Sequence, residues 1–325
     1  MVKMARARLA LVILLFIAAN PGRLAAQERK ITLGVTSRTG VTSLPFVIAE
    51  ERGLFKAEGL NVVVVQMQNQ VVVQGVLSKQ VDYGGTFSNF VGAVLAGLPL
   101  RVVMAVMEGS DHVLVTASTV KSVQDLKGKI VGISSFGGTP HSEAILVLRK
   151  HGLDPEKDVT FLQIGGSSSR YAALEAGTIH AAMLEPPFNK MGRKRGFNEL
   201  VAFDDVLKIP LAGLGVHVDT IRDRPGEIVK MIKAVLRSLD FIRSQKTEIL
   251  AVMEKSWGVK DPDVREGLYA DIVEFYTRTG IASDDKMNNA VRLVQEGRKT
   301  GATAPLSQIA DWSFAKKANE EMKGR

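Results

Sequence analysis

Four short polar segments hold most of the side chains that could do chemistry on a small molecule. They are rich in serine, threonine and glycine, and each follows a stretch typical of a β-strand: residues 36–43 (TSRTGVTS), 84–88 (GGTFS), 134–141 (SSFGGTPH) and 165–169 (GGSSS). Hydroxyl groups both donate and accept hydrogen bonds, and glycine lets the backbone approach a ligand closely. Three of the segments run directly into a predicted helix, whose first N–H groups lack partners and suit an anion. Any one of them could instead be an ordinary strand-to-helix turn with a capping hydroxyl, but the set of four favours a binding site.

Three charged or titratable residues lie in or beside these segments. Arg38 and Arg170 could meet an anionic group, although a surface role for either is an open alternative. His141 stands at the start of a predicted helix, and we place it near the binding site. The sequence therefore favours an anionic or polar organic ligand.

Patterns typical of catalysis or of metal binding are missing from the sequence. The five histidines are scattered, and no two are three or four residues apart, as a metal pair on one helix would be: His112, His141, His151, His180 and His217. No serine stands in a GxSxG context, no segment matches a nucleotide P-loop, and no GxGxxG follows a strand. We expect no catalytic residue, no metal and no cofactor.

The elements around these segments alternate between strand and helix, and the same order occurs twice along the chain. Alternation of this kind predicts parallel sheets covered by helices on both faces, here in two α/β lobes. We assign residues 27–111 and 215–325 to lobe 1 and residues 112–214 to lobe 2, with crossings near Asp111 and Leu214. Helices dominate after residue 225, and we expect this tail to pack on lobe 1. Since ligands bind beyond the carboxyl ends of parallel strands, the four polar segments should face one cleft between the lobes.

The first 26 residues have the layout of a cleavable export signal. Basic residues precede an uncharged apolar run over residues 9–19, and small residues follow a proline and a glycine. A membrane anchor or a buried helix is the alternative, but a bilayer span needs ~20 residues. Without cysteine, the exported chain would carry neither disulfides nor a lipid on an N-terminal cysteine. We expect it free in the periplasm.

The charge balance argues against a nucleic-acid partner. The net charge of the whole chain is +8, and four of the basic residues lie within the expected signal: Lys3, Arg6, Arg8 and Arg23. Subtracting them from +8 leaves +4, and the remaining basic residues are mixed with acidic ones along the chain. No basic stripe that would follow a phosphate backbone is visible.

Five segments, in order, resemble the sulfonate/nitrate/taurine-type substrate-binding proteins of ABC transporters, a group that includes binders of the thiamine pyrimidine precursor. They are residues 44–65 (LPFVIAEERGLFKAEGLNVVVV), 81–90 (VDYGGTFSNF), 122–133 (SVQDLKGKIVGI), 174–189 (LEAGTIHAAMLEPPFN) and 311–322 (DWSFAKKANEEM). The resemblance covers nearly all of the chain from about Lys30 onward.

This resemblance implies a type II periplasmic-binding-protein fold, in which two lobes close over a ligand. It also implies a monomer that delivers a small molecule to an ABC permease in the inner membrane. By position, the family's ligand contacts would fall on Thr36, Ser37, Thr86, Ser88, Ser135, Gly138, Thr139 and Ser168, with Glu185 close by.

Two other functions stay open from the sequence. The pyrimidine-precursor synthases are a related branch of cytosolic enzymes, but they use a cysteine-rich iron-binding segment, and this chain has no cysteine and an expected export signal. A sensor subunit with the same fold would bind the same ligand and report it to a membrane partner. We therefore expect a binding protein that is not an enzyme.

Overall fold

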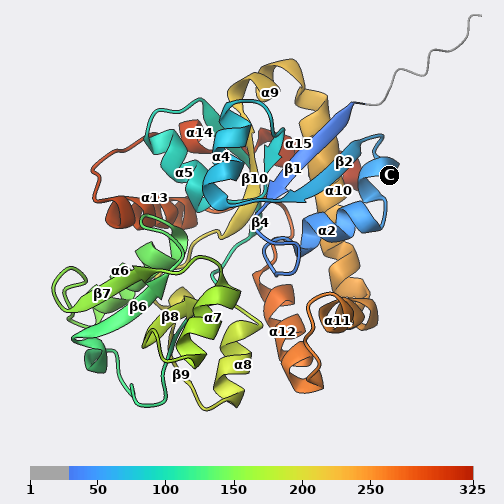
Figure 1. The fold of residues 1–325 in the computed structure, drawn as a ribbon. Coiled ribbons are helices and arrows are strands. Elements are labelled where there is room, and N and C mark those ends of the chain that lie inside the picture. Colours follow the sequence, from blue (N-terminus) through green and yellow to red (C-terminus); the bar gives the residue numbers. More distant parts are fainter. Residues whose placement is uncertain (1–28, 325) are drawn as a thin grey trace, which may run out of the picture. The chain divides into compact units, whose positions relative to one another are not determined.

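The computed structural model describes residues 29–324, in which the strands form two five-stranded sheets (Figure 1). The first sheet has the order β2 (Asn61–Gln66), β1 (Lys30–Val35), β3 (Tyr83–Gly84), β10 (Ala212–His217) and β4 (Leu100–Met107). The second has the order β7 (Val159–Gln163), β6 (Lys129–Ile133), β8 (Ala181–Leu184), β5 (Val113–Thr116) and β9 (Asn198–Ala202). Residues 31–325 form one compact unit. Each sheet with its helices is one of the two expected α/β lobes.

Both sheets are mixed. The prediction of parallel sheets was wrong for one strand in each sheet, β10 in the first and β5 in the second. β10 runs antiparallel to β3 and β4, and β5 runs antiparallel to β8 and β9, whereas the other pairs with a recorded register are parallel. The sequence-based prediction also did not include the strands β9 and β10. Glycines in β10 weaken its strand pattern, and they are needed because aromatic rings lie against its backbone. A Cβ on Gly213 would come within 2.8 Å of the Phe87 ring, and one on Gly215 would overlap the Phe90 ring.

The helices of the first lobe come from both ends of the chain. Those before the crossing are α2 (Leu44–Glu51), α3 (Leu54–Ala57), α4 (Asn69–Leu77) and α5 (Ser88–Leu95). Those after it are α9 (Val218–Asp223), α10 (Pro225–Ser244), α11 (Lys246–Lys255), α12 (Pro262–Phe275), α13 (Asp284–Arg298), α14 (Leu306–Ile309) and α15 (Ser313–Lys323). The second lobe has α6 (Thr139–Lys150), α7 (Ser167–Glu175) and α8 (Phe188–Lys194). No helix within residues 29–324 has both the length and the apolar character of a membrane span.

Helix α10 is the main support of the first lobe. Its apolar residues recur every three or four positions, which places them on one face, and they are buried: Ile228, Met231, Ile232, Val235, Leu236, Leu239 and Ile242. This face packs with α2, α3 and α15 in the core of the first lobe, as Figure 1 shows for the long golden helix. The expected packing of the helical tail on lobe 1 is confirmed.

The chain passes between the sheets twice, over residues 108–112 and over residues 203–211. The first passage contains Asp111. The second ends before Leu214, because that residue lies inside β10 of the first sheet. The boundary expected near Leu214 therefore moves to residues 203–211.

Helix α13 contacts both lobes, which the sequence did not indicate. It packs against α5 of the first lobe and against α6 of the second, and its Leu293 belongs to the apolar core of the second lobe. Gly297 allows the close approach to α6, because a Cβ at this position would overlap Ser142 Oγ and lie 2.6 Å from Ser142 Cβ. A small residue is therefore required on this helix where the lobes meet.

Gly297→Ala is expected to lower the free energy of unfolding by about 1 to 3 kcal/mol, because the added methyl group overpacks the contact between α13 and α6. Urea denaturation would measure the loss, and Ser142→Gly in the same chain should recover part of it. Gly267→Ala is the matched control, since Gly267 lies in α12 with nothing within 4 Å of the added Cβ. That variant should gain up to about 1 kcal/mol. Equal effects at positions 267 and 297 would contradict the packing argument.

Candidate functional site

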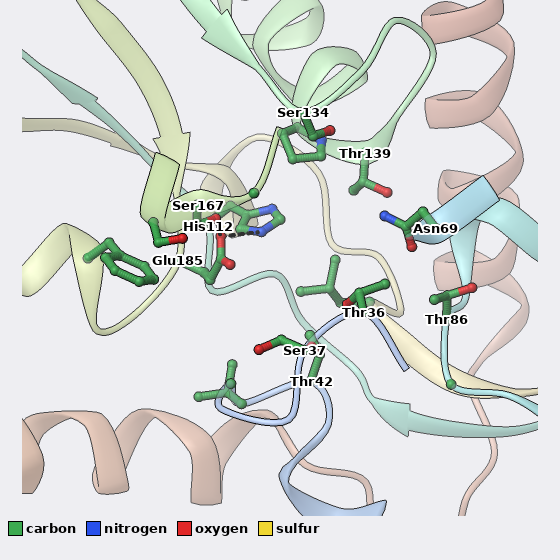
Figure 2. Close-up of a pocket in the computed structure, with 18 of the residues that line it drawn as sticks. Thr36, Ser37, Thr42, Asn69, Thr86, His112, Ser134, Thr139, Ser167 and Glu185 are labelled. Carbon is green, nitrogen blue, oxygen red and sulfur yellow. Dashed lines mark hydrogen bonds and ion pairs between the residues drawn. The ribbon is translucent and has the colours of Figure 1, made fainter. Parts of the chain in front are cut away.

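A cavity of about 320 Å³ is lined by loops of both lobes, next to the ends of their strands (Figure 2). The first lobe contributes residues 36–37 and 39–42 after β1, residues 85–89 after β3, and Gln66 and Asn69. Leu211 stands at the end of the second crossing between the sheets. The second lobe contributes Ser134, Thr139 and Pro140 before and within α6, residues 166–168 and Arg170 at the start of α7, and residues 185–186 and Phe188 after β8. His112 lies on the crossing between the sheets. All four polar segments named from the sequence reach this cavity.

Eight of the twelve residues expected at the site line the cavity: Thr36, Ser37, Thr86, Ser88, Thr139, Ser168, Arg170 and Glu185. The other four, which do not line it, are Arg38, Ser135, Gly138 and His141. These four lie in the same loops, where their own contacts with the protein hold the loops in place.

Arg38 faces the protein and not the cavity. Its guanidinium lies 2.8 Å from Glu50 Oε2 and donates a hydrogen bond of 2.7 Å to the Val64 carbonyl, which ties the loop after β1 to β2 and α2. Ser135 and Gly138 form a turn in which Gly138 N donates to the Ser135 carbonyl at 3.1 Å. Gly138 is also the N-cap of α6. None of these groups is directed at a ligand.

His141 stabilises its own loop. Its Nδ1 accepts a hydrogen bond of 3.0 Å from Gly137 N, and its ring packs between the rings of Phe136 and Phe161. Burial, together with Lys299, lowers the pKa of His141, so the imidazole is neutral near pH 7. We expected His141 near the binding site; it stands next to the lining residue Pro140 but does not itself line the cavity.

Three buried hydroxyl groups at the cavity have no hydrogen-bond partner among the described residues: Thr86 Oγ1, Ser88 Oγ and Ser134 Oγ. Thr86 and Ser88 are more than nine-tenths buried and stand at the start of α5, and Ser134 lies across the cavity after β6. A buried hydroxyl without a partner costs about 1 to 3 kcal/mol. All three would gain a hydrogen-bond partner from a polar molecule bound in the cavity.

On the other side of the cavity, His112 lies between two carboxylates, those of Glu143 and Glu185. Figure 2 shows His112 beside Glu185 and Ser167. His112 Nδ1 lies 2.5 Å from Glu143 Oε2, and His112 Nε2 lies 3.3 Å from Glu185 Oε2. Glu143 is fully buried behind the cavity wall and also accepts a hydrogen bond of 2.9 Å from Ser110 Oγ. The imidazole thus bridges a buried carboxylate and one that faces the cavity.

The electrostatics of this network fix its protonation. Burial alone would lower the pKa of His112, but the carboxylates of Glu143 and Glu185 outweigh it and hold that pKa well above its usual value. Burial likewise opposes ionisation of Glu185, but His112, Arg170 and Ser167 bring its pKa to about 2. At neutral pH the cavity therefore meets a carboxylate backed by an imidazolium.

Arg170 is held entirely by the protein, at 2% exposure. Its guanidinium donates to the Gly165 and Met183 carbonyls and to Ser167 Oγ, and lies 3.6 Å from Glu185 Oε2. Burial lowers the pKa of Arg170 from its very high ordinary value. Arg170 thus joins the loop before α7 to the end of β8.

Sequence reasoning missed several residues that line the cavity, notably Asn69, His112, Ser134 and Ser167. Asn69 begins α4 directly after β2, which is a strand-to-helix position like the four that were chosen. Ser134 and Ser167 lie inside two of the chosen segments. His112 had only one signal, its place at the predicted crossing between the lobes.

The arrangement is unsuited to nucleophilic catalysis by the serine nearest to the charged network. Ser167 Oγ donates its hydrogen bond to Glu185. A carboxylate with a pKa of about 2 is a poor proton acceptor, and general bases work best with a pKa near the operating pH. Among residues 29–324, no group of three or more His, Cys, Asp or Glu side chains has a metal-binding arrangement.

Comparison with solved structures supports the same fold. The periplasmic aliphatic sulphonate binding protein SsuA of Escherichia coli aligns with a TM-score of 0.71 and 18% identity, over 86% of this chain and 97% of that one. The ligand-binding component of an ABC-type import system from Staphylococcus aureus aligns with a TM-score of 0.72 and 14% identity, over 89% and 99%. The expected periplasmic-binding-protein fold is confirmed.

The relatives found by sequence comparison include a binding protein and a synthase. YtlA of Bacillus subtilis strain 168, whose name describes a binding protein, is 24% identical over 85% of this chain and 86% of its own length. The 4-amino-5-hydroxymethyl-2-methylpyrimidine phosphate synthase THI13 of Saccharomyces cerevisiae S288c is 25% identical over 66% of this chain and 67% of its own. The two identities are similar, but the match to the synthase covers a smaller share of both chains.

Residues 41–249 match the family described as NMT1/THI5 like. This match covers well over half of the 325 residues and includes most of the cavity-lining segments. It agrees with the resemblance noted in five segments of the sequence. The chain belongs to the NMT1/THI5-like family.

Proposed function

We propose that this protein is the solute-binding component of an ABC importer, which captures a small polar molecule in the cavity and delivers it to a permease in the inner membrane. The observation that carries the proposal is the set of three buried, unpartnered hydroxyls of Thr86, Ser88 and Ser134. They come from both lobes, so a ligand that pairs with them joins the lobes. Two proteins that share the fold support it: SsuA is described as a periplasmic aliphatic sulphonate binding protein, and the Staphylococcus aureus protein as the ligand-binding component of an ABC-type import system.

Capture works by closure of lobe 2, residues 112–211 in this proposal, against the rest of the described chain. Ion pairs of Lys190 with Asp271 and of Lys194 with Asp261 link α8 to α12. Exposed pairs of this kind contribute at most ~1 kcal/mol each, so they do not lock the lobes. Because α13 packs on α6 and its Leu293 belongs to the core of the second lobe, α13 has to move with lobe 2 on closure. The contacts of a bridging ligand then decide the equilibrium, and the crossings at residues 108–112 and 203–211 absorb the bend.

We also propose that the protein binds its ligand without transforming it, and that it works as a monomer in the periplasm. Ser167 donates to a weakly basic carboxylate, and the cavity offers hydroxyl and amide groups suited to recognition. Export would use residues 1–26, which lie outside the described residues. The proposal differs from the synthase activity named for THI13 in requiring no chemical change of the ligand.

Mass spectrometry of small molecules released from the protein, purified from the periplasm of an expressing bacterium, tests this function. One small polar compound should be released and should rebind unchanged in calorimetry. The Thr86→Val/Ser88→Ala variant should bind it at least tenfold more weakly, since each tenfold is about 1.4 kcal/mol. The empty variant should unfold at a higher temperature than the wild type, because two unpartnered hydroxyls are gone.

Thr160→Val is the matched control, since Thr160 is exposed on β7 and does not line the cavity. It should leave the affinity unchanged. Failure to recover or bind any compound would refute the proposed function. Conversion of the recovered compound by the protein would refute the proposal that it is not an enzyme.

A further inference from the structure

The two carboxylate oxygens of Glu185 have different surroundings. Oε2 accepts a hydrogen bond from Ser167 Oγ and lies 3.3 Å from His112 Nε2 and 3.6 Å from an Arg170 nitrogen. Oε1 has no recorded partner among the described residues, and the side chain is 27% exposed at the cavity. One hydrogen bond and two cationic groups therefore converge on a single oxygen of the carboxylate, which leaves the other oxygen for a ligand. Figure 2 shows Glu185 beside His112 and Ser167 at the cavity.

The cationic groups nearby are already occupied. Both ring nitrogens of His112 lie against carboxylates, and four of the five N–H groups of Arg170 donate to the Gly165 carbonyl, the Met183 carbonyl or Ser167 Oγ. The positive charges of His112 and Arg170 are therefore balanced by the negative charges of Glu143 and Glu185. No described side chain that lines the cavity offers an uncompensated positive charge.

The protein's own carboxylate also occupies the helix end that we expected to hold an anion. Ser167 is the first residue of α7, and its hydroxyl is bonded to Glu185. A ligand anion approaching the first turn of α7 would meet the negative charge of Glu185. The partial positive charge at the N-terminus of α7 therefore already interacts with the carboxylate of Glu185.

We propose that Glu185 selects the ligand by charge: Oε1 accepts a hydrogen bond from an amine or amidine, and the carboxylate excludes ligands with an anionic group at this end of the cavity. This inference rests on the proposed function, because it concerns the ligand of the same cavity. Asn69 and Thr86 lie across the cavity from Glu185 and can pair with the other polar atoms of the ligand (Figure 2). Since the pKa of Glu185 is about 2, the selection holds throughout the neutral range.

Benzamidine, benzamide and benzoate test the proposal, because they share one shape and differ in charge and in N–H donors. Calorimetry with the wild-type protein should give the tightest binding for benzamidine, weaker binding for benzamide, and at least tenfold weaker binding for benzoate. Glu185→Gln should reduce benzamidine binding at least tenfold. It should also raise the affinity for benzoate, because His112 and Arg170 then lack one counter-charge.

Glu175→Gln is the matched control, because it removes one negative charge from α7 at a residue that does not line the cavity. It should leave the order of the three affinities unchanged. The wild-type comparison does not depend on any variant folding. The proposal is overturned if wild-type protein binds benzoate as tightly as benzamidine, if it binds none of the three, or if Glu185→Gln keeps the order. Benzoate binding in the cavity would leave the solute-binding function standing, whereas failure to recover any ligand would count against that function itself.

Discussion

Replacement of Asp111 by asparagine is expected to raise the free energy of unfolding at pH 8 by about 3 to 4 kcal/mol. Both carboxylate oxygens of Asp111 are buried without a partner. Burial raises the pKa of Asp111 to about 7. The negative charges of Glu185 and Glu143 also raise this pKa, whereas His112 and the backbone N–H of Asp111 lower it. The nearby Tyr276 is buried too, and burial keeps its phenol uncharged by raising its pKa well above the usual value. A rise from 3.8 to about 7 corresponds to about 4 kcal/mol, at 1.36 kcal/mol for each pKa unit.

The sign of this effect follows from proton linkage. The folded protein holds the Asp111 proton more tightly than the unfolded chain does, so the stability from this group is full below pH 3.8 and is lost as the pH rises to about 7. Asparagine cannot ionise and keeps the shape of the side chain. Urea denaturation should therefore show equal stability of wild type and variant near pH 4 and a large gain for the variant at pH 8.

The matched control for this effect is Asp240→Asn, at an exposed carboxylate of α10. It should change the unfolding free energy by less than about 0.5 kcal/mol at both pH values. An Asp111→Asn protein that is less stable than the wild type at pH 8 would mean that the buried charge is stabilised in the native protein.

The second large effect is expected for Glu143→Gln, with a loss of about 3 to 5 kcal/mol at pH 6. Glu143 is fully buried and contacts His112 Nδ1 at 2.5 Å, so its replacement leaves a buried imidazolium without its main counter-charge. The raised pKa of His112 means that its stabilisation is full below pH 6.5 and is lost as the pH rises through the folded-state pKa. The deficit of the variant should therefore shrink at high pH.

Urea denaturation of wild type and Glu143→Gln at pH 6 and pH 9 would measure this difference. His112→Gln in the Glu143→Gln chain is the control, because it removes both charges of the pair and should recover part of the loss. A deficit that is the same at both pH values, or that the second substitution does not reduce, would show that the pair is not charged in the native protein.

The fold could largely be predicted from the sequence, because local patterns specify most of its elements. The spacing of apolar residues predicts α10, and runs such as residues 61–66 predict buried strands. Strand β10 was missed for a tertiary reason. Its glycines leave room for the rings of Phe87 and Phe90, which pack against the backbone of this strand. The sequence of residues 212–217 alone does not show that these rings pack there.

The polar side of the candidate site was predictable, whereas its charged network was not. Loops of serine, threonine and glycine at strand ends are visible in the sequence, and all four reach the cavity. The network depends on residues far apart in the chain, since His112, Glu143 and Glu185 meet only after folding. For the same reason, the sequence favoured an anionic or polar organic ligand, whereas the carboxylate of Glu185 leads us to propose that an anionic group is excluded at its end of the cavity.

The position of β10 between β3 and β4 has a consequence for the order in which the chain can fold as it is made. The strands of the second sheet occupy one continuous stretch, residues 113–202, so that sheet can pair as soon as this stretch is available. The first sheet lacks an inner strand until residues 212–217 arrive, and its covering helix α10 comes later still. The second sheet, from the middle of the chain, can therefore form before the first sheet, whose N-terminal strands lack β10 until later. Domains usually fold in order from the N-terminus to the C-terminus. The core of the first lobe also includes Ala315 and Ala318, so a nascent chain of this topology stays incompletely folded until nearly all of it has been synthesised.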